Sequence, residues 1–157
     1  MNEKWNSLIQ QLYDEYKTYN PFVLVEKIGI EVLFVPFGKT PKGETVRFKK
    51  ETLILLNEDL LEENERYFVL AHELYHAVEH DNLSAYYTTQ RNGKGTLERE
   101  ANTFAGNLML HLYKEDCGYL PETFQDLQSV YGVPIDLEPY LVTFVSKLTL
   151  DNSYSLM

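Results

Sequence analysis

The chain has 157 residues, 44% of them hydrophobic and 13% aromatic, which is typical of a folded domain and excludes a disordered segment. Its formal net charge of −10 argues against direct contact with nucleic acid, whose phosphates would be repelled, and would instead attract a basic protein partner. No apolar run approaches the roughly 18 residues needed to cross a bilayer, so no membrane partner is expected.

The N-terminus and the single cysteine both indicate a cytoplasmic protein. Residues 1–16, MNEKWNSLIQQLYDEY, have the pattern of an amphipathic helix and lack an apolar signal core. Cys117 has no second cysteine to pair with, which agrees with a reducing compartment. A catalytic thiol is an alternative reading of Cys117, but we expect a buried or half-buried packing residue. The sequence gives no indication of the oligomeric state.

The first part of the chain predicts two helices followed by a small sheet. Apolar residues at helical spacing predict an amphipathic helix over 3–17. Asn20 and Pro21 suit the N-cap and first turn of a short second helix, which Gly29 ends. Three runs rich in apolar and β-branched residues predict strands, the last two around a Lys-rich turn. The predicted strands are 30–36, 44–49 and 51–56.

The rest of the chain predicts helices. Apolar periodicity indicates long helices over about 62–80 and 97–112, separated by a loop-like stretch, 81–95, that ends in RNGKG. A loop of that length between two long helices suggests a functional role. A third helix is expected between Pro121 and Gly132, and a terminal fourth over 133–148.

Residues 72–76 read HELYH, a pattern that suits a catalytic zinc site. On a helix, His72 and His76 lie one turn apart on the same face, so both imidazoles can reach one tetrahedral ion at about 2.0–2.1 Å. Glu73 lies beside the first histidine, where its carboxylate can take a proton from water and pass it to a leaving amine. The alternative reading is a pair of helix-surface histidines with a solvated glutamate.

A catalytic zinc ion needs a third protein ligand and an open position. Glu98 and Glu100, in LEREANTFA, are about 200° apart around a helix, so at most one faces the metal. Glu98 is favoured because it lies near the apolar face, although helical phase leaves Glu100 open. Asn102, one turn after Glu98, is placed to orient a ligating histidine. His80 lies about 12 Å along the axis from His72, too far to share the metal, and suits a helix-dipole role.

Three further side chains have structural and functional readings. His111 ends the second long helix, where a structural role is expected. Tyr86 and Tyr87 lie in the predicted loop, and either hydroxyl would be able to stabilise the oxyanion of a tetrahedral intermediate. In a chain with twelve tyrosines, packing is the ordinary role for both.

The chain resembles the ImmA/IrrE family of zinc metallo-endopeptidases. The opening segment of the family is similar to NPFVLVEKIGIEVLFVPF, and its strand ending in asparagine is similar to TLILLNEDL. The family's metal helix is similar to RYFVLAHELYHAVEH, and its third-ligand segment is similar to LEREANTFAGNLML. Its C-terminal part is similar to SVYGVP. HExxH alone is shared by unrelated peptidases, but its combination with E-x-E-A-N-x-F-A about twenty residues later is more specific. Two features depart from the family. Tyr75 replaces the glycine of HELGH, which would narrow the cleft or change helix packing, and the region of His111 replaces a Leu-Leu-x-Pro ending.

The resemblance implies an α+β fold with a mainly helical, zincin-like metallopeptidase core, a small three-stranded sheet and C-terminal helices. We expect a single domain over 1–157. Its peptidase core would cover 1–112, including the metal helices at about 62–80 and 97–112. Residues 113–150 would form a C-terminal helical subdomain.

By motif position the resemblance assigns His72, His76 and Glu98 as ligands of one zinc ion, and Glu73 as the general base. The implied substrate is a specific cytoplasmic protein, a helix-turn-helix transcriptional repressor of a phage or mobile element. One alternative is a non-catalytic zincin-like binding module that regulates a repressor by contact. Another is a toxin–antitoxin partner.

Overall fold

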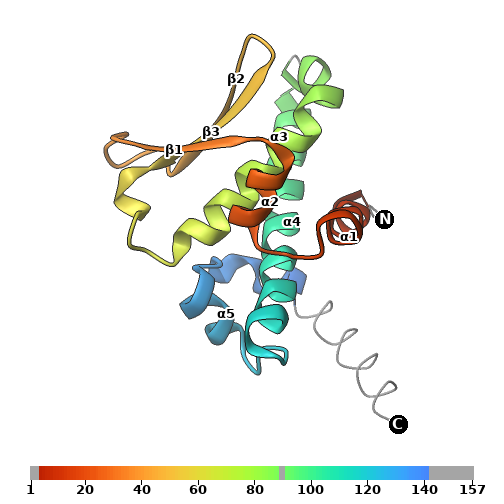
Figure 1. Ribbon diagram of the computed structural model, residues 1–157, viewed down its shortest axis with the longest axis vertical. Coiled ribbons are helices and arrows are strands. Elements are labelled where there is room, and N and C mark those ends of the chain that lie inside the picture. The colour runs from red at the N-terminus through yellow and green to blue at the C-terminus, as the bar shows by residue number, and fades with distance from the viewer. Residues whose placement is uncertain (1–3, 89–90, 142–157) are drawn as a thin grey trace.

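The computed structural model describes residues 4–88 and 91–141, and only the backbone within 80–94. It confirms the predicted α+β class, with a three-stranded mixed sheet, a pair of long helices and shorter C-terminal helices (Figure 1). In chain order the elements are α1 (Lys4–Tyr16), α2 (Pro21–Ile28), β1 (Glu31–Val35), β2 (Gly43–Phe48), β3 (Glu51–Asn57), the 3-10 helix η1 (Glu58–Leu60), α3 (Glu65–Thr88), α4 (Arg91–Cys117), α5 (Phe124–Tyr131) and the 3-10 helix η2 (Ile135–Leu137).

The start of α2 follows from its capping residues. The Asn20 side chain accepts a hydrogen bond from the Phe22 backbone N–H at 2.9 Å, and Pro21 occupies the first helical turn, where no N–H is needed. The helix ends before Gly29. Both predicted limits of this helix are confirmed.

The sheet has the order β1-β3-β2, with β3 parallel to β1 and antiparallel to β2. Lys49 and Lys50 form the predicted Lys-rich turn between β2 and β3. At the end of β3 the buried Asn57 side chain donates hydrogen bonds to the carbonyl oxygens of Gly38 at 2.6 Å and Pro41 at 3.1 Å. Asn57 therefore fixes the connection that leads into the edge strand β2.

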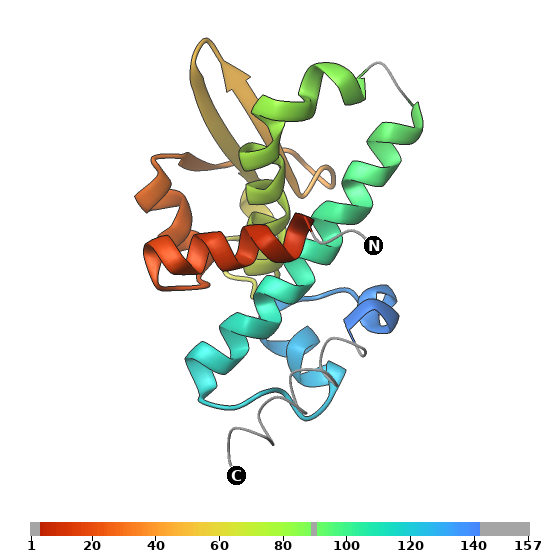
Figure 2. The same cartoon turned by 90° about the vertical axis from the view of Figure 1, so that its right-hand side faces the viewer.

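The long helices α3 and α4 run antiparallel side by side, while α1 lies across them and the sheet covers another side of α3 (Figures 1 and 2). Fully buried apolar side chains, several of them alanines, occur on both helices, and small side chains allow helices to approach closely. From α3 these are Leu70, Ala71 and Leu74, and from α4 they are Ala101, Phe104, Ala105 and Leu108.

The predicted loop over 81–95 is wrong, because α3 continues to Thr88 and α4 already begins at Arg91. Gly93 and Gly95 suggested a break, yet a glycine inside a helix costs only about 1 kcal/mol relative to alanine and does not by itself end one. The stretch contains no proline. The two metal helices predicted at 62–80 and 97–112 are therefore each longer than expected.

The C-terminal part also differs from the prediction in detail. Helix α5 begins at Phe124 rather than at Pro121, because Thr123 and Asp126 form a reciprocal capping box. Of the predicted helix over 133–148, η2 and a helical turn at 138–141 are present, and the remainder lies outside the described residues.

The exposure of Cys117 differs from the prediction. Cys117 is exposed at the end of α4 and not buried as predicted, because the last turn of that helix extends beyond the core.

Within residues 4–88 and 91–141, no helix has both the length and the apolar character required to cross a membrane.

Gly132 is the point at which α5 meets α3, and we expect its replacement to be costly. Its φ is +71°, and an added Cβ would lie 2.5 Å from the Cα of Glu65. Gly132→Ala should lower the free energy of unfolding by about 3 kcal/mol, the sum of left-handed backbone strain and overpacking. Urea denaturation measures this. Gly118→Ala is the control, since its φ is +88° but its surroundings are open, so about 1–2 kcal/mol is expected. Equal losses in the two variants would contradict this account of Gly132.

Candidate metal and catalytic site

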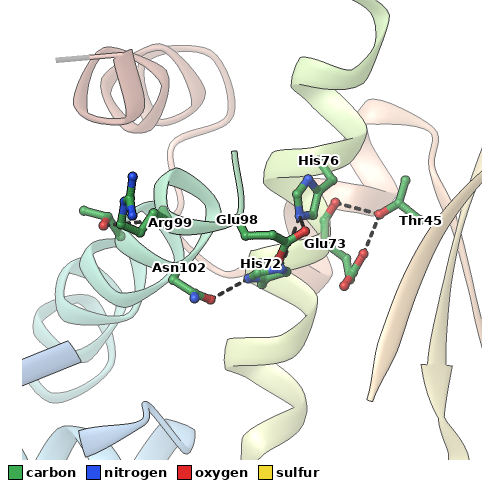
Figure 3. Close-up of polar contacts among 8 residues, drawn as sticks. Thr45, His72, Glu73, His76, Glu98, Arg99 and Asn102 are labelled. Atoms are coloured by element: carbon green, nitrogen blue, oxygen red, sulfur yellow. Dashed lines mark hydrogen bonds and ion pairs between the residues drawn. The ribbon is translucent and has the colours of Figure 1, made fainter. Parts of the chain in front are cut away.

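His72 and His76 of α3 and Glu98 of α4 converge on one point (Figure 3). The Nε2 atom of His72 lies 3.0 Å from one carboxylate oxygen of Glu98, and the Nε2 atom of His76 lies 3.0 Å from the other. The two Nε2 atoms are 3.2 Å apart. Two neighbouring turns of one helix and the first part of another thus bring three metal-ligating groups together.

The orientation of the His72 ring is set by Asn102, one turn after Glu98 on α4. The Nδ1 atom of His72 lies 2.7 Å from the Asn102 side-chain oxygen, the contact that the spacing suggested. When Nδ1–H donates to this oxygen, the Nε2 atom of the neutral ring carries a lone pair. That lone pair faces the Glu98 carboxylate and the His76 ring.

This set of donor atoms fits a small divalent cation. Ligand atoms about 2.0–2.1 Å from a tetrahedral zinc ion lie about 3.3 Å from one another, close to the 3.0–3.2 Å found among these three side chains. Lone pairs of an imidazole and a carboxylate repel each other at such distances unless a proton or a cation lies between them. Two imidazole nitrogens and one carboxylate oxygen are a ligand set that suits zinc.

The second acid, Glu100, does not reach the histidines. Its carboxylate accepts a hydrogen bond from the Tyr75 hydroxyl at 2.9 Å, and the fully buried Tyr75 ring packs 5.2 Å from the ring of Phe104. The structure therefore brings Glu98, and not Glu100, to the two rings. Tyr75 lies between α3 and α4, in line with the expectation that it changes how the helices pack.

Glu73 extends from α3 toward strand β2 and meets Thr45 there (Figure 3). The Thr45 hydroxyl lies 2.8 Å from the Glu73 Oε1 atom and 3.0 Å from the Glu73 backbone oxygen. Burial raises the pKa of the Glu73 carboxyl, and the neighbouring His72 and the hydrogen bond from Thr45 offset only part of this effect. Thr45 was missed in the sequence because a threonine within a predicted strand is common and carries no functional signal.

The pKa values of the Glu98 carboxyl and the His72 imidazole depend on each other. Hydrogen bonds from His72 and His76 hold the pKa of the Glu98 carboxyl well below its usual range, despite partial burial. Burial alone would lower the pKa of His72, but the hydrogen bond to Glu98 and the negative charges of Glu73 and Glu98 outweigh it, so the pKa is raised. Without a metal, His72 and Glu98 therefore favour a protonated imidazole paired with a carboxylate.

The remaining candidates from the sequence fall outside this cluster. His111 is half-buried, and its ring stacks on Tyr19 with 4.7 Å between the centroids, in line with a structural role. Burial and the nearby Lys114 lower the pKa of His111 to about 4. The side chains of His80, Tyr86 and Tyr87 lie outside the described part of the chain.

The chain is similar to one protein family and to one phage protein. Residues 25–134 match the sequence model of the peptidase M78 family, described as the IrrE N-terminal-like domain. The chain is 33% identical over 132 residues to "Uncharacterized immunity region protein 2" of Bacillus phage phi105, covering 82% of this chain and 83% of that protein. No solved structure matches. The chain therefore belongs to the peptidase M78 family of metallopeptidases, which confirms the resemblance to the ImmA/IrrE family.

The linked charges predict a pH-dependent contribution to the stability of the metal-free protein. The lowered pKa of Glu98 makes its contribution present above the unfolded value, near 4.5, and lost as the pH falls through the folded value. The raised pKa of His72 makes its contribution present below the unfolded value, near 6.5, and lost as the pH rises through the folded value. The pair should therefore stabilise the metal-free fold most between about pH 4.5 and 6.5.

Thermal unfolding in the presence of a chelator measures this contribution. The difference in Tm between the parent protein and Glu98→Gln should be larger at pH 5.5 than at pH 8.5. Because Glu98 is about half exposed, solvent screening will keep the difference small. A difference that does not change between the two pH values would contradict the linkage.

Proposed function

We propose that the chain is a zinc-dependent endopeptidase that acts in the cytoplasm. In this proposal His72, His76 and Glu98 are the ligands of one zinc ion and Glu73 is the general base. The observation that supports it most strongly is the convergence of the two Nε2 atoms on the Glu98 carboxylate, at 3.0 Å each, beside a buried glutamate. Membership of a metallopeptidase family supports the same reading.

A zinc ion bound to these ligands would polarise the peptide carbonyl and acidify a water molecule, which is what peptide hydrolysis needs. Glu73 takes a proton from the attacking water as the new C–O bond forms. It returns the proton to the leaving nitrogen as the C–N bond breaks. The raised pKa of the Glu73 carboxyl brings its two protonation states closer in free energy at neutral pH, which suits this double transfer.

The edge strand β2 supports an extended peptide as the substrate. The Asn57 N–H donates to the Lys42 carbonyl, and hydrogen-bonded pairs alternate along antiparallel strands. By this alternation the backbone N–H and C=O groups of Gly43, Thr45 and Arg47 face away from β3. A flexible segment of another protein can pair with such an edge, one residue of which contacts Glu73.

We propose a helix-turn-helix repressor of a phage or mobile element as the protein that carries this segment. The phage relative is named an immunity region protein, and we extend that setting to this chain. A DNA-binding protein carries basic surfaces, and the net charge of −10 would attract it when it is not bound to DNA. The competing reading is a non-catalytic binding module, which the bulk of Tyr75 favoured, and the buried position of Tyr75 between α3 and α4 weakens that reason.

Glu73→Gln tests the proposed base. The substitution keeps the shape of the side chain but removes the group that accepts a proton, so cleavage should fall by at least about a hundredfold while zinc remains bound. Zinc content by mass spectrometry and cleavage of co-expressed helix-turn-helix proteins from the same gene neighbourhood are the measurements. Cleavage at the parental rate would exclude Glu73 as the base.

The paired variants Glu98→Gln and Glu100→Gln test the third ligand. An amide is a much poorer zinc ligand than a carboxylate, so Glu98→Gln should weaken zinc binding by about tenfold or more. Glu100→Gln makes the same chemical change two residues away, at a side chain bound to Tyr75, and should leave zinc affinity unchanged. Competition with a chromogenic chelator measures both. The reverse order of the two effects would assign the ligand to Glu100.

A further inference from the structure

Thr45 of strand β2 contacts Glu73 from outside the helix that carries the HELYH motif (Figure 3). We propose that Thr45 is a positioning residue that holds the Glu73 carboxyl group in place and links its position to a peptide bound along β2. This inference depends on the proposed function, because it assigns Thr45 a role in the same reaction. It adds a residue from the sheet to a site whose other members all lie on α3 and α4.

The Thr45 hydroxyl makes two contacts with the same residue. It lies 2.8 Å from the Glu73 side-chain Oε1 atom and 3.0 Å from the Glu73 backbone oxygen. A hydroxyl has one hydrogen and two acceptor lone pairs. When Glu73 is a carboxylate, Thr45 can donate to Oε1. When Glu73 carries a proton, the carboxyl O–H can donate to Thr45, whose hydrogen then turns to the Glu73 backbone oxygen. The same threonine therefore holds the group before and after proton transfer.

The approach of β2 to α3 makes these contacts close ones. A Cβ atom at Gly43 would lie 2.8 Å from the Val69 Cγ1 atom and 3.1 Å from the Glu73 Cγ atom, so the strand lies against the helix at this point. One residue earlier, the Lys42 ammonium pairs with Glu65 in the first turn of α3. These contacts hold β2 against α3 on the N-terminal side of Thr45 and keep its side chain close to Glu73.

The backbone hydrogen-bonding groups of Thr45 point in a different direction from its side chain. Its N–H and C=O groups belong to the outer edge of β2, where an extended peptide would pair, while its side chain contacts Glu73. A peptide bound on this edge would therefore contact the residue that holds the base. Removal of the hydroxyl leaves the backbone groups unchanged, so the turnover rate should change and the binding of the peptide should not.

Thr45→Val tests the proposal, because valine matches the shape of threonine and lacks the hydroxyl. The probe is a proteome-derived peptide library, and the peptide that the parent protein cuts fastest is used for steady-state kinetics. We expect kcat to fall by about ten- to a hundredfold, as for a lost hydrogen bond to a charged group, with KM and bound zinc unchanged. Thr45→Ser should restore kcat close to the parental value, since the hydroxyl is present again.

Thr52→Val is the matched control. Thr52 lies on the neighbouring strand β3, and its hydroxyl oxygen accepts a hydrogen bond from Arg47 at 3.1 Å. This variant should keep the parental kcat. A general effect of lost hydroxyl groups on the sheet would slow both valine variants, and that outcome would overturn the positioning role.

A crystal structure of the Thr45→Val protein gives a readout that does not depend on activity. The Glu73 carboxyl group should leave its place between α3 and β2, and its persistence there would overturn the proposal. Thr45→Ala replaces the valine variant if that protein does not fold. Parental kcat in either variant, with Glu73→Gln inactive, would exclude Thr45 and leave the proposed function standing. Parental cleavage by Glu73→Gln would instead reject the proposed function itself.

Discussion

The site depends on the close packing of α3 against α4. The two imidazoles belong to α3 and the nearest acid, Glu98, belongs to α4, so only the contact between the helices places these groups 3.0 Å apart. Fully buried alanines, Ala71 on α3 and Ala101 and Ala105 on α4, allow that approach. A metal bound by ligands from both helices would add its binding free energy to the stability of the fold, because the unfolded chain has no such preformed site.

The side chains of His72 and Glu73 leave helix α3 in different directions because consecutive helical residues are about 100° apart. His72 faces α4, where Glu98 and Asn102 hold it, while Glu73 turns toward β2 and Thr45. One helix thus separates the proposed metal ligands from the proposed base by a single step in sequence. The strand that meets Glu73 is also an edge strand of the sheet. The arrangement therefore brings an edge suited to an extended peptide beside the Glu73 carboxyl group. In the proposed reaction this group would transfer the proton from water to the leaving nitrogen.

The parts of the site that follow helical periodicity could be predicted from the sequence, and the parts set by tertiary contact could not. The spacing of HELYH and the step from Glu98 to Asn102 fix relative positions within one helix, so the contact of Asn102 with His72 was foreseen. The choice between Glu98 and Glu100 needed the packing of two helices. Thr45 comes from a strand whose approach to α3 no local pattern encodes. The ligand and base roles themselves stay predictions. The prediction of a loop over 81–95 was wrong because glycines weaken a helix without ending it.

Tyr75 shows how the packing of α3 against α4 accommodates a departure from the family pattern. A glycine at this position would leave the space between α3 and α4 without the ring that now packs on Phe104. The large ring also buries a hydroxyl, and a buried hydroxyl without a partner is costly. Glu100 supplies the acceptor at 2.9 Å, and helical phase already turns its carboxylate about 200° away from Glu98. The residue that replaces glycine in the motif therefore fills the helix interface, and its hydroxyl pairs with the acid that faces away from the imidazoles.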